Sequence, residues 1–520
     1  MKLEILKRRK SIYENLKHKA LSFEDRGDSL NEYLNDQSLM AQRDFTLSNL
    51  EELKQRVLKS DFIFLGDFHT FDQNIRNALR VIKVLEENDS KFVIALEMIH
   101  HSKQVCIDAY LEGHLTELEF LDSIEYSKSW KFPWTHYKVL FQLAKEKDVH
   151  LLAVNTSAGL KQRDIFCANH LKKNQYLFKD AKCLVLYGEL HIVSDKIPKQ
   201  VKQLFPNSTQ LIIHQNLDEV YWKTNEQITE APIFKFNEEE FCILSSPPWI
   251  KYESMLYWYE NLYNDPDFDL HEYIIETGKK FFSEDTQETF SNLVLEMKNI
   301  VGLNINDEVI DDHNLYDHIS IDYVEDQIDE LPEHFKEYYW DLLKNGESFR
   351  LPNENTYYCS SYSLNRISYI AGTHIYYSFQ KKSLDQLSFN IEENFINNIF
   401  ESCFGYFFSK LINPHRKCDL YQDFLLQKRL RRIHLLIEII DYQFDFLKLN
   451  SYSTVEQKKI SQHLGHFLGE YLYFKAYKSI IQTNAIENLL GLIPCSKSLE
   501  FLMKTILNDI DFKKHQKRFF

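Results

Sequence analysis

The stretch FIFLGDFH at Phe62–His69 decides the fold predicted for this chain, because a short apolar run ends there in a glycine, a carboxylate and a histidine. A second segment, CLVLYGELH at Cys183–His191, repeats the order: an apolar run, then glycine, an acid, one further residue and histidine. Side chains two residues apart in an extended strand point to the same face. We therefore expect the acid and the histidine of each segment to share a face, so that two strands each supply one carboxylate and one imidazole.

Similar short apolar runs recur between residues 50 and 225, namely FVIALEM (92–98), VHLLAVN (149–155) and TQLIIHQ (209–215). Nearly continuous apolar runs are typical of strands buried on both faces of a parallel sheet. Helical patterns separate the runs, and one of them repeats apolar residues on a single face from Ile75 to Leu85. The alternation predicts right-handed crossovers and an α/β domain, with a parallel sheet and flanking helices.

The pattern changes after Phe236, and a Pro-Pro pair at 247–248 interrupts regular structure. Long amphipathic patterns then predict an all-α C-terminal domain; they cover 363–382, 388–412, 419–449, 455–484 and 486–509. We expect four segments along the chain: an N-terminal helical segment (1–49), the α/β domain (50–250), a mixed connecting region (251–350) and the α-helical domain (351–520).

One helical pattern of the C-terminal domain, SQHLGHFLGEYLYF, places His463, His466 and Glu470 on one face. A metal site between facing helices is one interpretation of these residues. We favour the other, in which the histidines are buried and hydrogen-bonded beside Gly465 and Gly469, two glycines that allow close helix packing.

The totals of the chain disfavour several classes of protein. A formal net charge of −16 argues against nucleic acid or an anionic membrane as the principal partner, since phosphates are neutralised by a surplus of Lys and Arg. The eight cysteines show no CxxC spacing, as in a protein folded in a reducing compartment. The charged N-terminus lacks the apolar core of a signal peptide, and no run approaches the roughly 18 apolar residues of a membrane helix. We expect a cytoplasmic protein without a membrane span.

Polar side chains stand at the C-terminal ends of the predicted strands, where open parallel sheets bind ligands. They are Asp67, His69, Glu97, Asn155, Glu189 and His191. Imidazole and carboxylate ligands suit Mn, Fe, Co or Zn, which predicts a metal site of His69, His191 and Glu97. A carboxylate of Asp67, Glu97 or Glu189 would then serve catalysis by activating water. Without a metal, the same groups form an acid/base pair. The plainest alternative is that each histidine only caps a helix or satisfies a loop.

A second polar group follows the run at 92–98. His100, His101 and Gln104 lie near the same edge of the sheet if a helix begins near Ser102, which is a suitable N-cap. Together with Asn155, these side chains are predicted to contact a bound cofactor. A capped, solvated helix start is the alternative interpretation.

Aromatic residues form a third group, in the segment SKSWKFPWTHYKVL. Trp130, Phe132, Trp134 and Tyr137 can wall a pocket for an apolar or planar ligand, and Tyr137 or His136 can serve as axial ligand to a haem iron. The alternative is that these aromatic side chains hold the loop against the core.

Four segments together resemble a known family: LGDFHTF (65–71), FVIALEMIHH (92–101), SWKFPWTHY (129–137) and LVLYGELH (184–191), with the sequence around each. The chain resembles the ChaN family, the haem-binding uptake branch of a superfamily that also holds Tiki metalloproteases, TraB proteins and erythromycin esterases. The hallmark of that superfamily is two Gly-x-x-His motifs with a strand-end glutamate between them, matched here by Gly66–His69, Gly188–His191 and Glu97. The resemblance covers about residues 50–220.

The resemblance implies a bacterial α/β domain that binds haem in iron acquisition, or that hydrolyses a substrate with the His/Glu cluster. Two departures stand out: Asp67 occupies a position where Glu is commoner, and the chain shows neither a signal peptide nor a lipobox cysteine, unlike many exported relatives. We therefore expect a ChaN-like protein that binds haem or a divalent metal. The alternatives are a metal-dependent esterase or peptidase, and a non-catalytic interaction scaffold. The expected partner is haem or another small molecule, and a homodimer is left open.

Overall fold

The computed structural model describes residues 2–23, 27–224, 233–262, 286–317, 320–352, 355–380, 391–443 and 445–520. The chain divides into two compact units. An α/β unit comprises Tyr13–Leu270 and Arg518–Phe520, and a helical unit comprises Met1–Ile12 and His271–Lys517.

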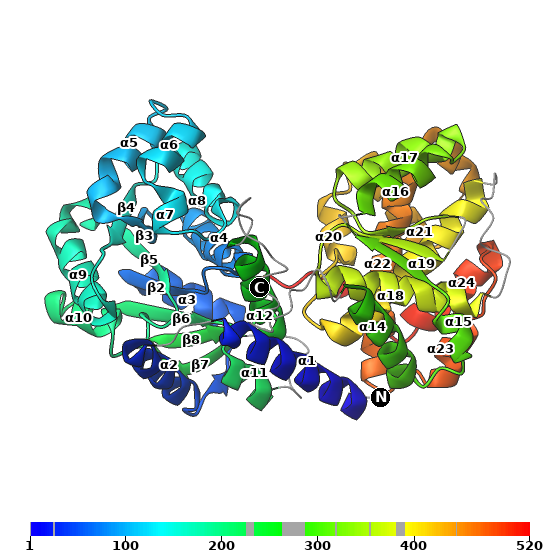
Figure 1. Cartoon of the computed structure of the whole chain (residues 1–520), viewed down its shortest axis with the longest axis horizontal. Coiled ribbons are helices and arrows are strands. Elements are labelled where there is room, and N and C mark those ends of the chain that lie inside the picture. Colours follow the sequence, from blue (N-terminus) through cyan, green and yellow to red (C-terminus); the bar gives the residue numbers. More distant parts are fainter. Residues whose placement is uncertain are drawn as a thin grey trace, which may run out of the picture. The chain divides into compact units, whose positions relative to one another are not determined.

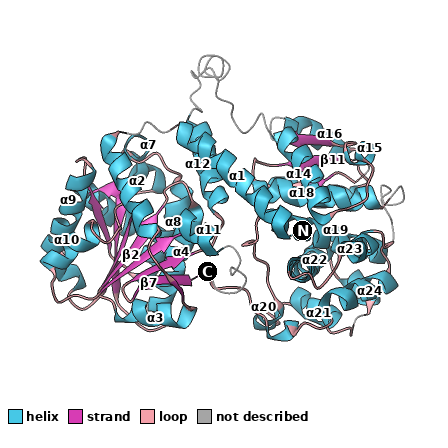
Figure 2. Cartoon of the chain, turned by 90° about the horizontal axis from the view of Figure 1, so that it is seen from below, coloured by secondary structure: helices cyan, strands magenta, loops and turns pink. Residues whose placement is uncertain are grey.

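An eight-stranded sheet with the order β1-β7-β8-β6-β2-β5-β3-β4 forms the centre of the α/β unit (Figures 1 and 2). Its pairs run parallel, except that β7 is antiparallel to both β1 and β8. The strands are β1 (Thr46–Leu47), β2 (Phe62–Asp67), β3 (Phe92–His100), β4 (Leu151–Asn155), β5 (Lys182–Gly188), β6 (Gln210–Gln215), β7 (Ile233–Asn237) and β8 (Glu240–Ile243).

The predicted strands β2 to β6 are all confirmed, and the α/β fold class with them. Strand β5 ends at Gly188, however, so Glu189 and His191 lie in the turn that follows it. The expectation that these two side chains extend from one strand face is therefore wrong. In the first segment the acid and the histidine do meet, since Asp67 ends β2 and His69 folds back onto it with a 2.9 Å hydrogen bond.

Helices cover both faces of the sheet, as crossover connections between parallel strands require. One face packs against α3 (Leu50–Lys59), α4 (Asp72–Glu86) and α8 (Trp134–Lys147). The other packs against α9 (Leu160–Lys173) and α10 (Ile197–Leu204), which lie together at one side of the unit in Figure 1. Strand residues alternate between these two cores, so every central strand is buried on both sides.

The α/β unit has seven further helices in the described residues, of which α5, α6 and α7 contribute Ile107, Phe120 and Tyr126 to the first of these cores. They are α1 (Lys2–Ser22), which belongs to this unit from Tyr13 on, α2 (Asp28–Ala41), α5 (Gln104–Leu111), α6 (Glu117–Ser123), α7 (Tyr126–Ser129), α11 (Asp218–Thr224) and α12 (Pro248–Leu262).

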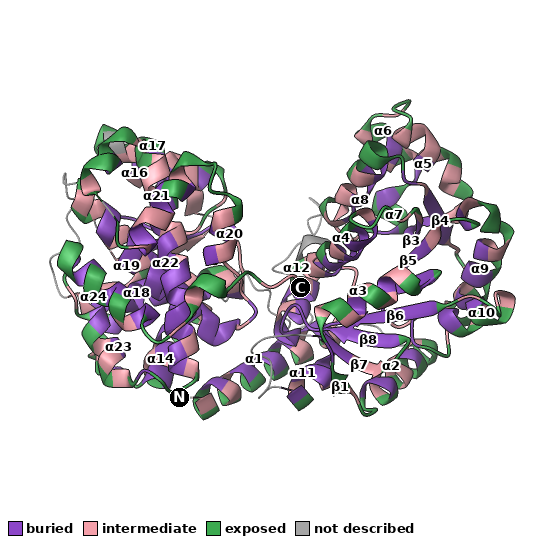
Figure 3. Cartoon of the chain, turned by 180° about the vertical axis from the view of Figure 1, so that it is seen from behind, coloured by how far each residue is buried: buried purple, intermediate pink, exposed green. Residues whose placement is uncertain are grey.

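The helical unit is built around α19 (Ile391–Ile412) and α22 (Thr454–Tyr477), which are largely buried in Figure 3. Around them lie α14 (Thr286–Val301), α15 (Asp307–Ile310), α16 (Ile321–Asp329), α17 (Glu333–Lys344), α18 (Leu364–Phe379), α20 (Tyr421–Leu426), α21 (Arg431–Ile440), α23 (Thr483–Leu490) and α24 (Ser496–Leu507). A small sheet of order β10-β11-β9 precedes α18, with β9 (Asn314–Asp317), β10 (Phe349–Arg350) and β11 (Thr356–Cys359).

The helical pattern predicted for the C-terminal part is confirmed from Leu364 on, with some long patterns divided into shorter helices. Parts of two predicted helices, 381–382 and 388–390, lie outside the described residues. The predicted close packing at the glycines of α22 is also confirmed: a Cβ on Gly465 would lie 2.7 Å from the carbonyl oxygen of Ile399 on α19. In the described part of the chain, we find no helix with the length and apolarity that a membrane crossing demands.

Candidate functional site

The C-terminal ends of β2, β5 and β3, which are adjacent in the sheet, bring the sequence-distant motifs together. In the parallel register Asp67 lies beside Gly188, and Glu97 near the end of β3 places its carboxylate at the same point. The backbone N–H of Gly188 donates a hydrogen bond of 2.6 Å to Glu97 Oε2. Sequence reasoning placed these groups at one edge, and the structure shows them in contact.

The first histidine belongs to a three-residue chain of hydrogen bonds. His69 Nδ1 is 2.9 Å from Asp67 Oδ2, and the hydroxyl of Tyr137 on α8 donates to the same oxygen at 2.6 Å. His69 Nε2 lies 3.7 Å from Glu97 Oε2. Burial lowers the pKa of His69, but the hydrogen bond to Asp67 and the charges of Asp67, Glu97 and Glu189 outweigh burial, so the pKa is raised above its ordinary value. His69 is therefore suited to carry a proton.

The second histidine has an equivalent arrangement from different elements. His191 Nδ1 is 2.5 Å from Asp164 Oδ1 on α9, and the hydroxyl of Tyr33 on α2 donates to Asp164 Oδ2 at 2.5 Å. All three side chains are buried. The ring of His191 also contacts those of Tyr33 and Tyr187, with centroids 5.3 and 5.1 Å apart.

We call each histidine with its aspartate and tyrosine a histidine arm, and the two arms meet at Gly188. A Cβ placed there would lie 3.2 Å from Glu97 Oε2, 3.4 Å from His69 Nε2 and 3.5 Å from His191 Cδ2. Arg163 adds a positive charge at this point, since its Nη1 is 3.9 Å from Glu97 Oε1. Two imidazoles and a carboxylate thus surround a position that lacks a side chain of its own, and the guanidinium of Arg163 lies beside that carboxylate.

Glu189, predicted to stand with this group, is directed elsewhere. Its carboxylate lies 3.8 Å from the ammonium of Lys251 on α12, which also pairs with Asp218 at 3.0 Å. Burial raises the pKa of Glu189, and the charge of Lys251 offsets this only in part. The side chain therefore belongs to a buried ion-pair network between α11 and α12.

A divalent metal receives no support from this geometry. Across the described ranges, no cluster of three or more His, Cys, Asp or Glu side chains is placed to hold a metal ion. Both imidazoles already use one nitrogen on an aspartate, and Glu97 Oε2 accepts from a backbone N–H.

The polar residues predicted as cofactor contacts have local partners. Gln104 bonds through its side chain to the backbone of strand β4, accepting from Ala153 N at 2.8 Å and donating to the carbonyl of Leu151 at 2.8 Å. His101 Nδ1 is 3.1 Å from the carbonyl of Asn155. These bonds fix the β3–α5 connection to the sheet.

The other two residues of that group also bond locally. His100 Nδ1 is 2.8 Å from the hydroxyl of Ser102, and the His100 ring lies beside that of His101 with centroids 4.4 Å apart. The prediction of Ser102 as N-cap is wrong: His100 accepts from the backbone N–H of Ser102 and caps the 3₁₀ turn His101–Lys103, and α5 begins at Gln104. The side chain of Asn155 accepts from the backbone N–H of Thr156. Their role as cofactor ligands remains a prediction.

The aromatic side chains of this segment have two sets of neighbours. Trp134 is partly buried and packs against Phe120 and Phe141, with ring centroids 5.8 and 5.0 Å away. Trp130 and Phe132 instead lie against the imidazole of His69, with centroids 4.5 and 4.8 Å away. The His69 side chain keeps 22% of its surface exposed.

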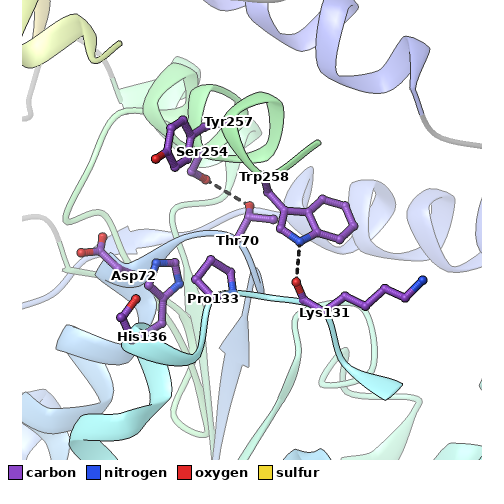
Figure 4. A pocket seen from close by; sticks show the side chains of 9 residues that line it. Thr70, Asp72, Lys131, Pro133, His136, Ser254, Tyr257 and Trp258 are labelled. Carbon is purple, nitrogen blue, oxygen red and sulfur yellow. Dashed lines mark hydrogen bonds between the residues drawn. The ribbon is translucent and has the colours of Figure 1, made fainter. Parts of the chain in front are cut away.

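A cavity of about 500 Å³ is lined in part by this segment (Figure 4). Its walls come from the β2–α4 connection, the start of α8 and helix α12: Thr70, Asp72, Lys131, Pro133, Thr135, His136, Ser254, Tyr257 and Trp258. Trp258 donates from Nε1 to the carbonyl of Lys131 at 3.0 Å, and Thr70 bonds Ser254 at 3.1 Å. Of the two residues considered as haem ligands, His136 lines this cavity, whereas Tyr137 is buried and donates its hydroxyl hydrogen to Asp67.

Sequence reasoning missed Tyr33, Asp164, Arg163 and the α12 residues. Arg163 and Asp164 sit in the first turns of the helix after β4, where a charged pair next to a strand end is a weak signal that many solvated helices share. Tyr33 lies more than 100 residues away from its partner on a helix with no motif. Only the tertiary fold brings them to the site.

A comparison with curated proteins gives no match. Two solved structures are similar. One is titled "Cofacial heme binding to ChaN of Campylobacter jejuni", at 16% identity over 37% of this chain and 90% of that chain, with a TM-score of 0.26. The other is the type III effector HopBA1, at 12% identity over 39% of this chain and 96% of that chain, with a TM-score of 0.27. Residues 53–165, which supply Asp67, His69, Glu97, His136 and Asp164, match the family described as haem-binding uptake, Tiki superfamily, ChaN.

Proposed function

We propose that the α/β unit binds haem in the cavity lined by His136 and Trp258, in a role in haem or iron handling. The observation that carries this proposal is the imidazole of His136 facing a cavity of about 500 Å³ within the segment that matches the haem-binding family. Ligand pockets of proteins typically measure roughly 300–1,000 Å³. His136 would hold haem through an imidazole nitrogen, and the bound haem would supply an iron centre.

The chemistry of the lining residues fits such a group. Burial lowers the pKa of His136, and the carboxylates of Asp72 and Asp67 offset this only in part, so the imidazole is neutral at pH 7 with a lone pair available. Trp258 stacks on Phe132 with centroids 4.6 Å apart and offers a flat apolar wall. Lys131 supplies a positive charge suited to a propionate.

Haemin titration of the purified chain, followed by its Soret absorption, tests the proposal. We expect saturable binding that weakens at least tenfold in His136→Ala and is unchanged in His114→Ala, which removes an exposed histidine of the same unit. Saturation at one haem per chain supports a monomeric site, and saturation at one haem per two chains supports a homodimer. Equal binding by both variants and the wild type would overturn the assignment to His136.

A second function, hydrolysis of an ester or amide, is favoured by the two histidine arms converging at Gly188. His191 takes a proton from water as the water oxygen bonds to the substrate carbonyl carbon. His69 donates its proton to the leaving oxygen or nitrogen as the bond to that carbon breaks, which yields an acid and an alcohol or amine. Arg163 stabilises the developing oxyanion, and Glu97 stabilises the imidazolium of His69.

Assays with p-nitrophenyl esters and chromogenic amides test the second function. His69→Gln and His191→Gln should each lose at least 100-fold in kcat/KM while haemin binding persists. A chelator should leave the rate unchanged if the cluster works as an acid/base pair, whereas loss on chelation and recovery with Mn, Fe, Co or Zn would restore the metal-dependent alternative. Absence of both haem binding and hydrolysis would favour an interaction scaffold.

A further inference from the structure

We propose that Asp164 and Tyr33 are positioning residues for His191, and that helix α2 is therefore part of the candidate catalytic site. The inference rests on the second proposed function, hydrolysis at the paired histidine arms. It assigns a role to the N-terminal helical segment, for which the sequence predicted none.

The hydrogen-bond geometry determines which nitrogen of His191 carries the proton. An ionised carboxylate only accepts hydrogen bonds, so Nδ1 must be the protonated nitrogen at 2.5 Å from Asp164 Oδ1. The lone pair then resides on Nε2, the ring atom bonded to Cδ2. The Cδ2 atom of His191 faces Gly188, because it lies 3.5 Å from where a Cβ of Gly188 would be.

Tyr33 fixes the carboxylate that holds the imidazole. Its hydroxyl donates to Asp164 Oδ2 at 2.5 Å, so each carboxylate oxygen has its own donor and the group cannot rotate without losing one of them. Burial and the hydrogen bond to Asp164 raise the pKa of Tyr33, which keeps its hydroxyl protonated as a donor. In the His69 arm, by contrast, Tyr137 and His69 share one oxygen of Asp67.

Helix α2 has the anchoring that a positioning element needs. Asp36 forms an ion pair with Lys196, the residue before α10, and Lys196 lies 4.4 Å from the ring centroid of Tyr33. Ser38 donates to Glu219 at 3.1 Å. These contacts fix the position of α2 and with it the Tyr33 hydroxyl that donates to Asp164.

The direct test measures the tautomer of His191 by NMR of the full chain labelled with ¹⁵N-histidine, with the signal assigned by its loss in His191→Gln. We expect the Nδ1–H tautomer in the wild type. Asp164→Asn should shift it to Nε2–H, because the amide nitrogen of Asn can donate to Nδ1, as an Asp-to-Asn change does in the serine protease triad. A wild-type Nε2–H tautomer, or an unchanged signal in Asp164→Asn, would overturn the proposal.

Kinetics supply the second measurement. Hydrolysis of a p-nitrophenyl ester should fall at least 100-fold in kcat in Asp164→Asn and about tenfold in Tyr33→Phe. KM should hardly change, since neither residue contacts the substrate. Tyr176→Phe, at a tyrosine that is 71% exposed in the same unit, is the matched control and should retain full activity. Equal rates in Tyr33→Phe and the control would remove Tyr33 from the site. If the wild type hydrolyses nothing, the hydrolytic function fails, but the NMR measurement still decides whether Asp164 positions His191.

Discussion

At the scale of single residues, the buried carboxylate of Glu240 is held in its charged form by specific partners. Glu240 on β8 is nearly fully buried, 3.0 Å from His214 Nε2 and 2.6 Å from Arg43. Burial raises its pKa, but the hydrogen bond and charge of His214 and those of Arg43 outweigh burial and hold the pKa at about 2. The same balance of burial against a partner operates at His69 in the site.

The lowered pKa of Glu240 predicts a pH-dependent stability. Because the folded-state pKa lies below the unfolded value near 4.5, this stabilisation is fully present above pH 4.5 and is lost as the pH falls towards 2. It amounts to at most about 3 kcal/mol. Denaturant unfolding between pH 7 and pH 3 should show a weaker pH dependence in Glu240→Gln. Glu238→Gln, an exposed carboxylate two residues away, should behave as the wild type, and equal slopes in all three would contradict the prediction.

At the scale of elements, the candidate site depends on where strands end. Strand β5 stops at Gly188, and the turn after it directs Glu189 to α12 and His191 to α9. Gly188 is not one of the glycines with a positive φ in the described chain, so any residue could adopt its backbone conformation. The turn does not require glycine here, but the missing side chain leaves room for the side chains of Glu97, His69 and His191.

Gly188→Ala should separate the two proposed functions. The added methyl would occupy the space between Glu97, His69 and His191, at 3.2 to 3.5 Å from their atoms. We expect at least a tenfold loss of ester hydrolysis, unchanged haemin affinity and a change in stability within about 1 kcal/mol. Gly159→Ala is the control, because a Cβ there meets only an ordinary contact at 3.8 Å. Full hydrolytic activity in Gly188→Ala would place the reaction elsewhere.

At the scale of the whole molecule, the chain contains two units, each with its own core. In the helical unit the glycines of α22 allow its backbone to approach α19 closely, and a Cβ on Gly469 would lie 2.5 Å from the carbonyl oxygen of Cys403. Overpacking of such a contact typically costs roughly 1–3 kcal/mol.

Gly465→Ala should therefore destabilise the helical unit by at least about 1 kcal/mol and leave haemin binding of the α/β unit unchanged. Thermal unfolding and haemin titration of the same preparation measure both quantities. Gly346→Ala is an informative control: nothing lies within 4 Å of its Cβ position, so any cost there arises from its positive φ and not from packing. Loss of haemin affinity in Gly465→Ala would show that the site depends on the helical unit.

The sequence by itself determined the parallel strands β2 to β6 and the first half of the site, but not β1, β7 and β8. Apolar runs ending in polar residues specify buried parallel strands, and the ends of such strands necessarily meet at one edge. Asp67, His69 and Glu97 could therefore be grouped from the linear pattern alone. The helices of the C-terminal part could also be predicted from the sequence, because their apolar periodicity extends over many turns.

Only the tertiary structure decided which partners complete the site. The strand period cannot show that β5 stops at Gly188, so Glu189 was grouped with His191 although a turn separates their directions. Asp164 and Tyr33 come from helices α9 and α2, whose approach to His191 depends on packing against the sheet and not on any local pattern. Local periodicity is encoded in consecutive residues, whereas the contacts that orient the His191 imidazole join three segments that are distant along the chain.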